Sequence, residues 1–125
     1  MRLLKALNDA GVRVLLGTDS PQLFNAPGFS IVREMQMMVD AGMTRYQVLR
    51  SGTEQVGEYF KRRCGTITPG ACADLILLDG NPLEDLTNLT RKRGVMVRGR
   101  WMPEDGIERR LEQIRSQPGN YRPAR

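Results

Sequence analysis

The apolar positions of the chain follow two different patterns. Over most of the first 60 residues they recur three or four apart, which is typical of amphipathic helices. The spacing predicts helices over residues 2–10, 31–41, 44–51 and 53–60, and a thin helix over 107–116. Residues 12–16 depart from it, because four of the five are apolar. That run predicts a strand buried on both faces, as in a parallel sheet.

This predicted strand stops at Gly17 and presents Thr18, Asp19 and Ser20 at its C-terminal end. A buried strand that delivers a carboxylate to its C-terminal end is the layout of a barrel active site. A lone parallel strand is not stable, and the chain offers no convincing neighbour for it.

The ends of the helices carry local signals. Thr44 and Gln47 form the pattern of a capping box, which predicts that a helix starts after Thr44. Ser30 is placed to cap the start of the predicted helix over residues 31–41. That helix and its end hold a cluster of methionines, which we interpret as core filling. The cluster comprises Met35, Met37, Met38 and Met43.

After residue 64 the pattern shortens to strands and turns. We expect strands at 65–67 and 73–78, and a hairpin formed by 95–98 and 101–102. Pro69-Gly70 and the run from Asp79 to Pro82 are typical turn sequences. The last residues, from Gln117, are polar and are expected to be disordered.

Composition excludes some classes of protein. With 125 residues and 40% hydrophobic content the chain suits one ordinary globular domain. No apolar run approaches the ~18 residues of a membrane span, and no signal peptide is recognisable, so a cytoplasmic location is favoured. The net charge of +5 comes entirely from residues 61–125. We interpret this excess as a solvated surface, because no nucleic-acid-binding module accompanies it.

The chain has two cysteines, Cys64 and Cys72, and no histidine. Two thiolates are half of a structural zinc ligand set, so the residues do not predict a zinc site. A disulfide across the Pro69-Gly70 turn is possible in principle, but we interpret the cysteines as two small buried thiols.

Several short motifs follow one another along the chain in a fixed order. They are G-T-D after the predicted strand, P-G-F-S before a helix holding Glu34, A-G-M-T, G-T-I-T-P-G-x-x-A-D-L-I-L-L-D, N-P-L-E-D-L and V-x-V-R-G-R-W. This set resembles the C-terminal third of the metal-dependent amidohydrolases, in particular the branch with imidazolonepropionase-like and Xaa-Pro dipeptidase-like hydrolases. The resemblance runs from about Leu3 to Met102.

The resemblance implies an α/β fold. Residues 1–62 would hold the last strand and helices of a (β/α)8 barrel, and residues 63–103 the C-terminal part of its small composite β-sandwich. Residues 104–125 would add a short helix and a flexible tail. The activity implied is hydrolysis of carbon–nitrogen bonds by a metal-activated water. The divalent metal, most often zinc, and a small amide, cyclic amide or dipeptide substrate would belong to the full-length enzyme.

The resemblance also implies roles for individual residues. Asp19 would be both a metal ligand and the catalytic carboxylate that takes the proton of the nucleophilic water and passes it to the leaving nitrogen. Ser20, Gln22 and Asn25 lie in a loop that would border the substrate. Asp74 would be structural and would bond to the backbone of the preceding turn.

Other family ligands are absent from this sequence: the H-x-H pair, a bridging lysine and two later histidines. One carboxylate holds a divalent ion poorly, so we expect this polypeptide to bind no metal and to hydrolyse nothing by itself. Self-association, or association with the missing N-terminal part, is expected because an unpaired strand is sticky. The alternatives are a non-catalytic module that binds a partner chain, and a basic module that binds anions or nucleic acid.

Overall fold

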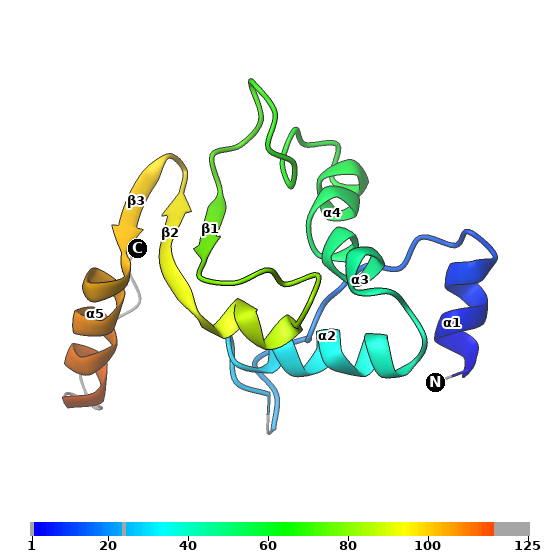
Figure 1. The fold of residues 1–125 in the computed structure, drawn as a ribbon, viewed down its shortest axis with the longest axis horizontal. Coiled ribbons are helices and arrows are strands. Elements are labelled where there is room, and N and C mark those ends of the chain that lie inside the picture. Colours follow the sequence, from blue (N-terminus) through cyan, green and yellow to red (C-terminus); the bar gives the residue numbers. More distant parts are fainter. Residues whose placement is uncertain (1, 24, 117–125) are drawn as a thin grey trace.

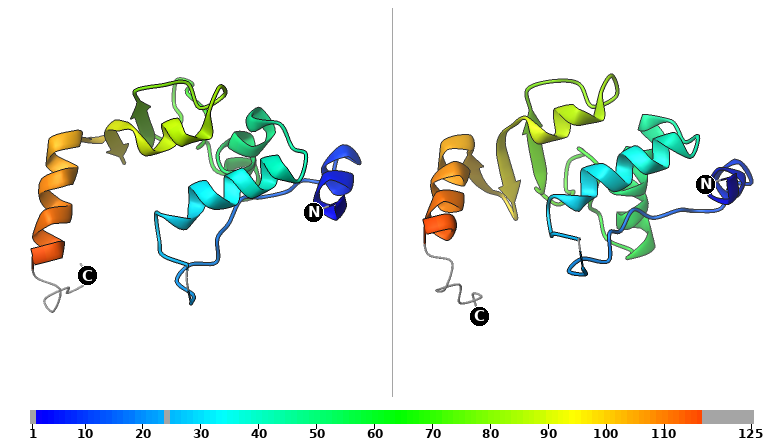
Figure 2. Two further views of the ribbon diagram at one scale, coloured as in Figure 1. Left: turned by 60° about the horizontal axis from the view of Figure 1, so that its bottom comes forward. Right: turned by 90° about the horizontal axis from the view of Figure 1, so that it is seen from below.

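The computed structural model describes residues 2–23 and 25–116 and shows a mixed α/β chain (Figure 1). Its helices are α1 (Arg2–Asp9), α2 (Ser30–Asp40), α3 (Arg45–Ser51), α4 (Glu54–Tyr59) and α5 (Glu104–Ser116). The 3-10 helix η1 (Leu86–Thr90) and the strands β1 (Leu75–Leu78), β2 (Lys92–Val97) and β3 (Arg100–Pro103) complete it. Figure 2 shows α1 and α5 at opposite ends of the molecule.

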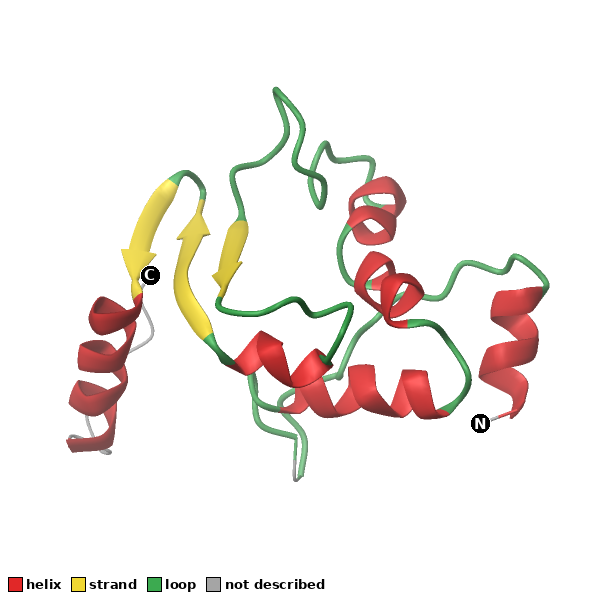
Figure 3. Cartoon of the chain, viewed as in Figure 1, coloured by secondary structure: helices red, strands yellow, loops and turns green. Residues whose placement is uncertain are grey.

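The three strands form one antiparallel sheet in the order β1-β2-β3 (Figure 3). Val95 in the central strand lies opposite Ile76 on one side and Met102 on the other. Arg98 and Gly99 connect β2 to β3 with positive φ angles of 51° and 76°. Left-handed turns of this kind match the twist of a hairpin, and the predicted hairpin is confirmed.

Asp74 stabilises this hairpin from outside it. Its Oδ1 accepts a hydrogen bond from the backbone N–H of Arg98 at 2.6 Å, and Gly99 N–H donates to the Ala73 carbonyl at 3.0 Å. The structural role is as expected, but the partner is different. Asp74 bonds to the turn between β2 and β3, not to the turn that precedes it in sequence.

The core lies between the helices. Met38, Met43 and Val48 are buried, and Leu4 and Leu16 pack against them. Leu86 of η1 is also buried, and η1 packs on α2, which joins the helical part to the sheet part. No helix within residues 2–23 and 25–116 combines the length and apolar character that crossing a membrane requires.

The methionine interpretation is confirmed for Met38 and Met43 and for Met35, which is partly buried. It is wrong for Met37, whose side chain is 48% exposed.

Two predictions about helix starts had different outcomes. Thr44 caps α3, and both hydrogen bonds of the capping box with Gln47 are present. The prediction for Ser30 is wrong: Phe29 occupies the cap position, no side chain caps the helix, and Ser30 is its first residue.

Two predicted strands do not form. Residues 12–16 and 65–67 are not part of any sheet within the described ranges, although the segment 12–16 is not helical either. The first segment is also not buried on both faces, since Val12 is 49% exposed. The strand prediction depended on neighbouring strands, which residues 2–23 and 25–116 do not supply. The expected tail, from Gln117, lies outside the described residues.

The loop from α4 to β1 is closed by a disulfide between Cys64 and Cys72, whose Cα atoms are 4.8 Å apart. The interpretation as two buried thiols is therefore wrong. The backbone reinforces the link, because Cys72 N–H donates to the Arg63 carbonyl at 2.7 Å. Gly57 lets the loop approach α4: a Cβ there would lie 2.1 Å from the Cys64 carbonyl oxygen.

We expect the disulfide to stabilise the fold. Closing a loop over a sequence separation of 8 residues restricts the unfolded chain and contributes about 2.5 kcal/mol. The double variant Cys64→Ser/Cys72→Ser should lose about this free energy of unfolding in urea titrations. A reductant should lower the wild type to the level of the variant and leave the variant unchanged. Equal stability of the variant and the oxidised wild type would contradict the prediction.

A short ion-pair network joins the sheet to α5. Asp79 accepts from Arg93 Nε at 2.8 Å and from Arg91 Nη2 at 3.2 Å, and Arg93 Nη1 also reaches Glu104 at 3.3 Å. The bond from Arg93, with a smaller contribution from Arg91, lowers the pKa of Asp79 below its ordinary value. The same pairing raises the pKa of Arg93.

Replacing Arg93 should move the pKa of Asp79 back up. Because the folded-state pKa is lowered, the stabilisation is present above the unfolded pKa of about 4 and is lost as the pH falls through the folded value. We therefore expect Arg93→Gln to raise the Asp79 pKa in an NMR titration. The stability gap to wild type should narrow below about pH 4. Arg115→Gln, which breaks a pair with Glu112 instead, should leave the Asp79 pKa unchanged.

Candidate functional site

The segment before the candidate site is held by α3. Leu16 N–H donates to the Ser51 carbonyl at 3.1 Å. Ser51 is fully buried, and its hydroxyl donates to the Val48 carbonyl at 2.6 Å. The Leu16 side chain packs directly on Gly52, where an added Cβ would lie 2.7 Å from Leu16 Cδ2. This backbone hydrogen bond and this side-chain contact therefore fix the position of the chain just before Gly17.

Asp19 follows at a sharp change of backbone direction. Its φ is 51°, in the left-handed region that aspartate tolerates better than most residues. The residue is exposed. Its carboxylate accepts a hydrogen bond from Gln22 Nε2. The structure thus presents the Asp19 carboxylate to solvent, with one side-chain donor beside it.

The loop after Asp19 folds on itself. The hydroxyls of Thr18 and Ser20 lie 2.9 Å apart in a hydrogen bond. Asn25 Nδ2 donates to the Thr18 carbonyl at 2.8 Å, and Asn25 N–H donates to the Gln22 carbonyl at 2.9 Å. The four residues predicted from the sequence, Asp19, Ser20, Gln22 and Asn25, therefore belong to one hydrogen-bonded loop.

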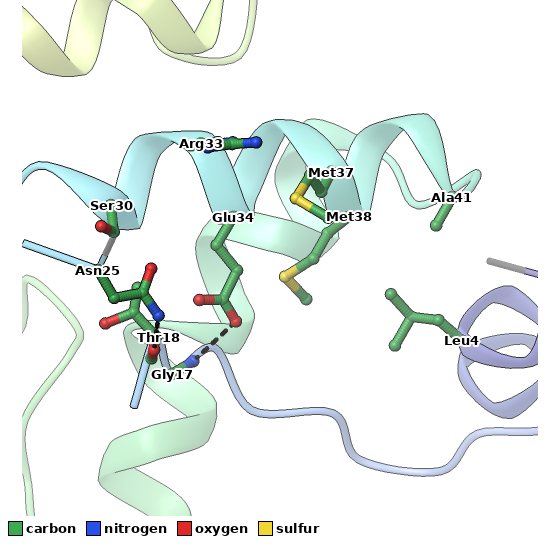
Figure 4. A pocket seen from close by; sticks show the side chains of 10 residues that line it. All are labelled: Leu4, Gly17, Thr18, Asn25, Ser30, Arg33, Glu34, Met37, Met38 and Ala41. Carbon is green, nitrogen blue, oxygen red and sulfur yellow. Dashed lines mark hydrogen bonds between the residues drawn. The ribbon is translucent and has the colours of Figure 1, made fainter. Parts of the chain in front are cut away.

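A cavity of about 580 Å³ lies between this segment, α1 and α2. Its polar end contains Gly17, Thr18, Asn25, Ser30, Arg33 and Glu34, and its apolar end contains Leu4, Met37, Met38 and Ala41. Figure 4 shows Glu34 reaching from α2 toward Gly17, and Leu4 closing the other end. Of the predicted residues only Asn25 lines this cavity; Asp19, Ser20 and Gln22 do not.

Sequence reasoning assigned no role to Glu34. Its Oε1 accepts from Gly17 N–H at 3.4 Å, so it meets the backbone immediately before Thr18 and Asp19. The available signal was an acidic residue on the same face as Ile31, Met35 and Met38. A carboxylate on an otherwise apolar helical face needs a donor, and Gly17 provides it.

The residues around Asp19 do not fit a metal ion. Within the described ranges one group of three potential ligands converges, and it consists of Cys64, Cys72 and Asp74, not Asp19. A single exposed carboxylate lacks the several converging ligands that divalent ions require. The part of the chain that the structure describes therefore does not form a metal site at Asp19.

Several solved structures are similar to this chain. A Xaa-Pro dipeptidase with bound methionine matches with a TM-score of 0.69 and 26% identity over 81% of this chain. The ochratoxinase of A. niger matches with a TM-score of 0.72 and 28% identity over 84% of this chain. A prolidase complexed with N-methylphosphonate-L-proline matches with a TM-score of 0.64 and 30% identity over 81%. The chain covers 25% of the length of each of these three structures.

The chain thus spans about a quarter of the length of the structures it resembles. No curated protein matches it significantly. The model of one family, described as the amidohydrolase family, matches residues 1–102, which is most of the chain and includes the loop with Asp19. With that match and the shared folds, the chain belongs to the amidohydrolase family.

Proposed function

We propose that this chain is the C-terminal portion of a metal-dependent amidohydrolase that hydrolyses carbon–nitrogen bonds. In this proposal residues 1–62 complete the (β/α)8 barrel, residues 63–103 contribute to the composite β-sandwich, and residues 104–125 form an appendage. The observation that carries the proposal is the extended segment 12–16, which has no strand partner in the described chain and leads directly to Asp19. Family membership over residues 1–102 supports it.

Asp19 is the residue of this chain that takes part in the reaction. Its carboxylate accepts the proton of the nucleophilic water and returns it to the leaving nitrogen. Exposure at the end of the segment suits this role, because a general base must reach its water. The full set of metal ligands, with zinc the expected ion, is completed outside the residues described here.

The proposed substrate is a dipeptide or another small amide. Two similar structures are a Xaa-Pro dipeptidase with bound methionine and a prolidase with a proline phosphonate. Ser20, Gln22 and Asn25 would border the substrate, because their loop carries Asp19 and is fixed by its own hydrogen bonds. A proline-containing dipeptide is therefore the first substrate to test.

The alternative is a stand-alone module that binds a partner chain. The segment 12–16, which has no strand partner in the described chain, supports this alternative as well as the main proposal. The basic-module alternative has weaker support. Four of the thirteen basic groups in residues 61–125 pair with carboxylates, which reduces their attraction for a polyanion. These pairs involve Arg91, Arg93, Arg109 and Arg115.

Asp19 alone should not hold a hard divalent ion. We expect calorimetric titration of Mn²⁺ into the oxidised protein to show no site tighter than about 1 mM, since weak oxygen-ligand sites reach this range only with several ligands. Asp19→Asn should give the same titration as wild type. A micromolar site that disappears in Asp19→Asn would contradict the proposal that the ligand set is completed elsewhere.

Activity should require the complementary part of the enzyme. We expect this chain, coexpressed with the N-terminal portion of the Xaa-Pro dipeptidase it resembles, to hydrolyse a Xaa-Pro dipeptide in a metal-dependent reaction. Asp19→Asn should lower the rate by about 100-fold or more, the usual contribution of a general base.

Asp40→Asn is the matched control, because Asp40 is an exposed aspartate on α2 whose carboxylate accepts a hydrogen bond from Gln36. It should retain wild-type activity. A complex that forms and turns over equally fast with Asp19→Asn would overturn the role of Asp19. A monodisperse chain that never associates with the N-terminal portion would favour the stand-alone module.

A further inference from the structure

A second group of metal-ligating atoms lies at the junction of α4 and the sheet. The sulfur atoms of Cys64 and Cys72 and a carboxylate oxygen of Asp74 all lie within 4.8 Å of one another. The sequence suggested half of a zinc ligand set here. The structure adds a third ligand that sequence spacing did not indicate, because Asp74 is brought to the sulfurs by the fold.

Backbone hydrogen bonds hold Cys72 and Asp74 in place. Cys72 is tied to the residue before Cys64 through its N–H bond to the Arg63 carbonyl. Asp74 is oriented by the Arg98 N–H, which occupies Oδ1 at 2.6 Å. That bond leaves the second carboxylate oxygen available. A donor that fixes the orientation of a ligating carboxylate is a common outer-shell element of metal sites.

We propose that, once the disulfide is reduced, Cys64, Cys72 and Asp74 form a site for one zinc-like divalent ion. Two thiolates and one carboxylate are three ligands of the kinds that zinc uses, and water would complete a tetrahedral set. Thiolates select such ions over Mg²⁺ and Ca²⁺.

The site is coupled to redox state. A dithiol reductant cleaves the sulfur–sulfur bond, delivers two electrons and two protons to the cysteines, and is itself oxidised to a cyclic disulfide. Metal binding then releases the two thiol protons to solvent. The oxidised loop is closed covalently and the reduced loop is closed by the ion. Neither state depends on the proposed hydrolase function or on Asp19.

The test is titration of Co²⁺ into protein that has been reduced and freed of reductant under anaerobic conditions. We expect a thiolate-to-cobalt charge-transfer band that saturates at one ion per chain and is displaced by Zn²⁺. The oxidised protein should show no band. Bound Zn²⁺ should also raise the melting temperature of the reduced protein, because it binds the folded state.

Three variants separate the ligands. Asp74→Asn keeps an acceptor for the Arg98 N–H but removes the charge, and should weaken Co²⁺ binding by about 10-fold or more. Asp9→Asn, an exposed control on α1, should bind like wild type. Cys72→Ser should lose the band. Circular dichroism of each metal-free variant checks folding.

Two outcomes would overturn the proposal. One is the absence of a cobalt band in reduced, folded wild type. The other is equal affinity in wild type and Asp74→Asn, which would exclude the carboxylate as a ligand. If Asp74→Asn fails to fold, the variants Cys64→Ser and Cys72→Ser test the site instead. Either variant, if it folds and still binds Co²⁺ as tightly as wild type, also overturns the proposal.

Discussion

The segment 12–16, which has no strand partner among the described residues, is the constraint on which the rest of the candidate site depends. A strand in a parallel sheet satisfies its N–H and C=O groups through neighbours on both sides. Here the bond from Leu16 N–H to the Ser51 carbonyl and the packing of Leu16 on Gly52 fix its end instead. These contacts, with the bonds from Gly17 N–H to Glu34 and from Asn25 to the Thr18 carbonyl, position Gly17, Thr18 and Asp19. The helical core therefore sets the site, although none of its buried residues has a chemical role there.

Features that depend on nearby residues could be predicted from the sequence. The helices, the Thr44–Gln47 capping box and the hairpin after Val95 all follow from spacing within a few residues, and the structure contains each. The motifs also pointed to the amidohydrolase family, and the family match confirms this. Asp19 was singled out because it follows a short apolar run, and the loop to Asn25 because of the family resemblance. Their roles in a site stay predictions.

Features that depend on distant contacts could not be predicted. Whether residues 12–16 pair as a strand is decided by neighbours outside the run, and spacing cannot supply them. Phe29 occupies the cap position in place of Ser30. The backbone N–H groups of Phe29 and Ser30 both donate to the Ala26 carbonyl, so the turn before α2 sets where the helix begins. The bond from Glu34 to Gly17 and the approach of Asp74 to both cysteines join segments that only the folded chain brings together. Asp74 thus has a partner in the hairpin that its local sequence did not indicate.

Trp101 packs across β2 onto Gly94, where an added Cβ would lie 2.1 Å from the indole ring. It is the single tryptophan of the chain. Intrinsic fluorescence of this protein consequently reports on the environment of the β2–β3 hairpin. The loop from Gly17 to Asn25 belongs to another part of the fold and contributes no indole signal. Optical detection of events near Asp19 therefore requires a probe introduced there, and an unchanged emission spectrum says nothing about that loop.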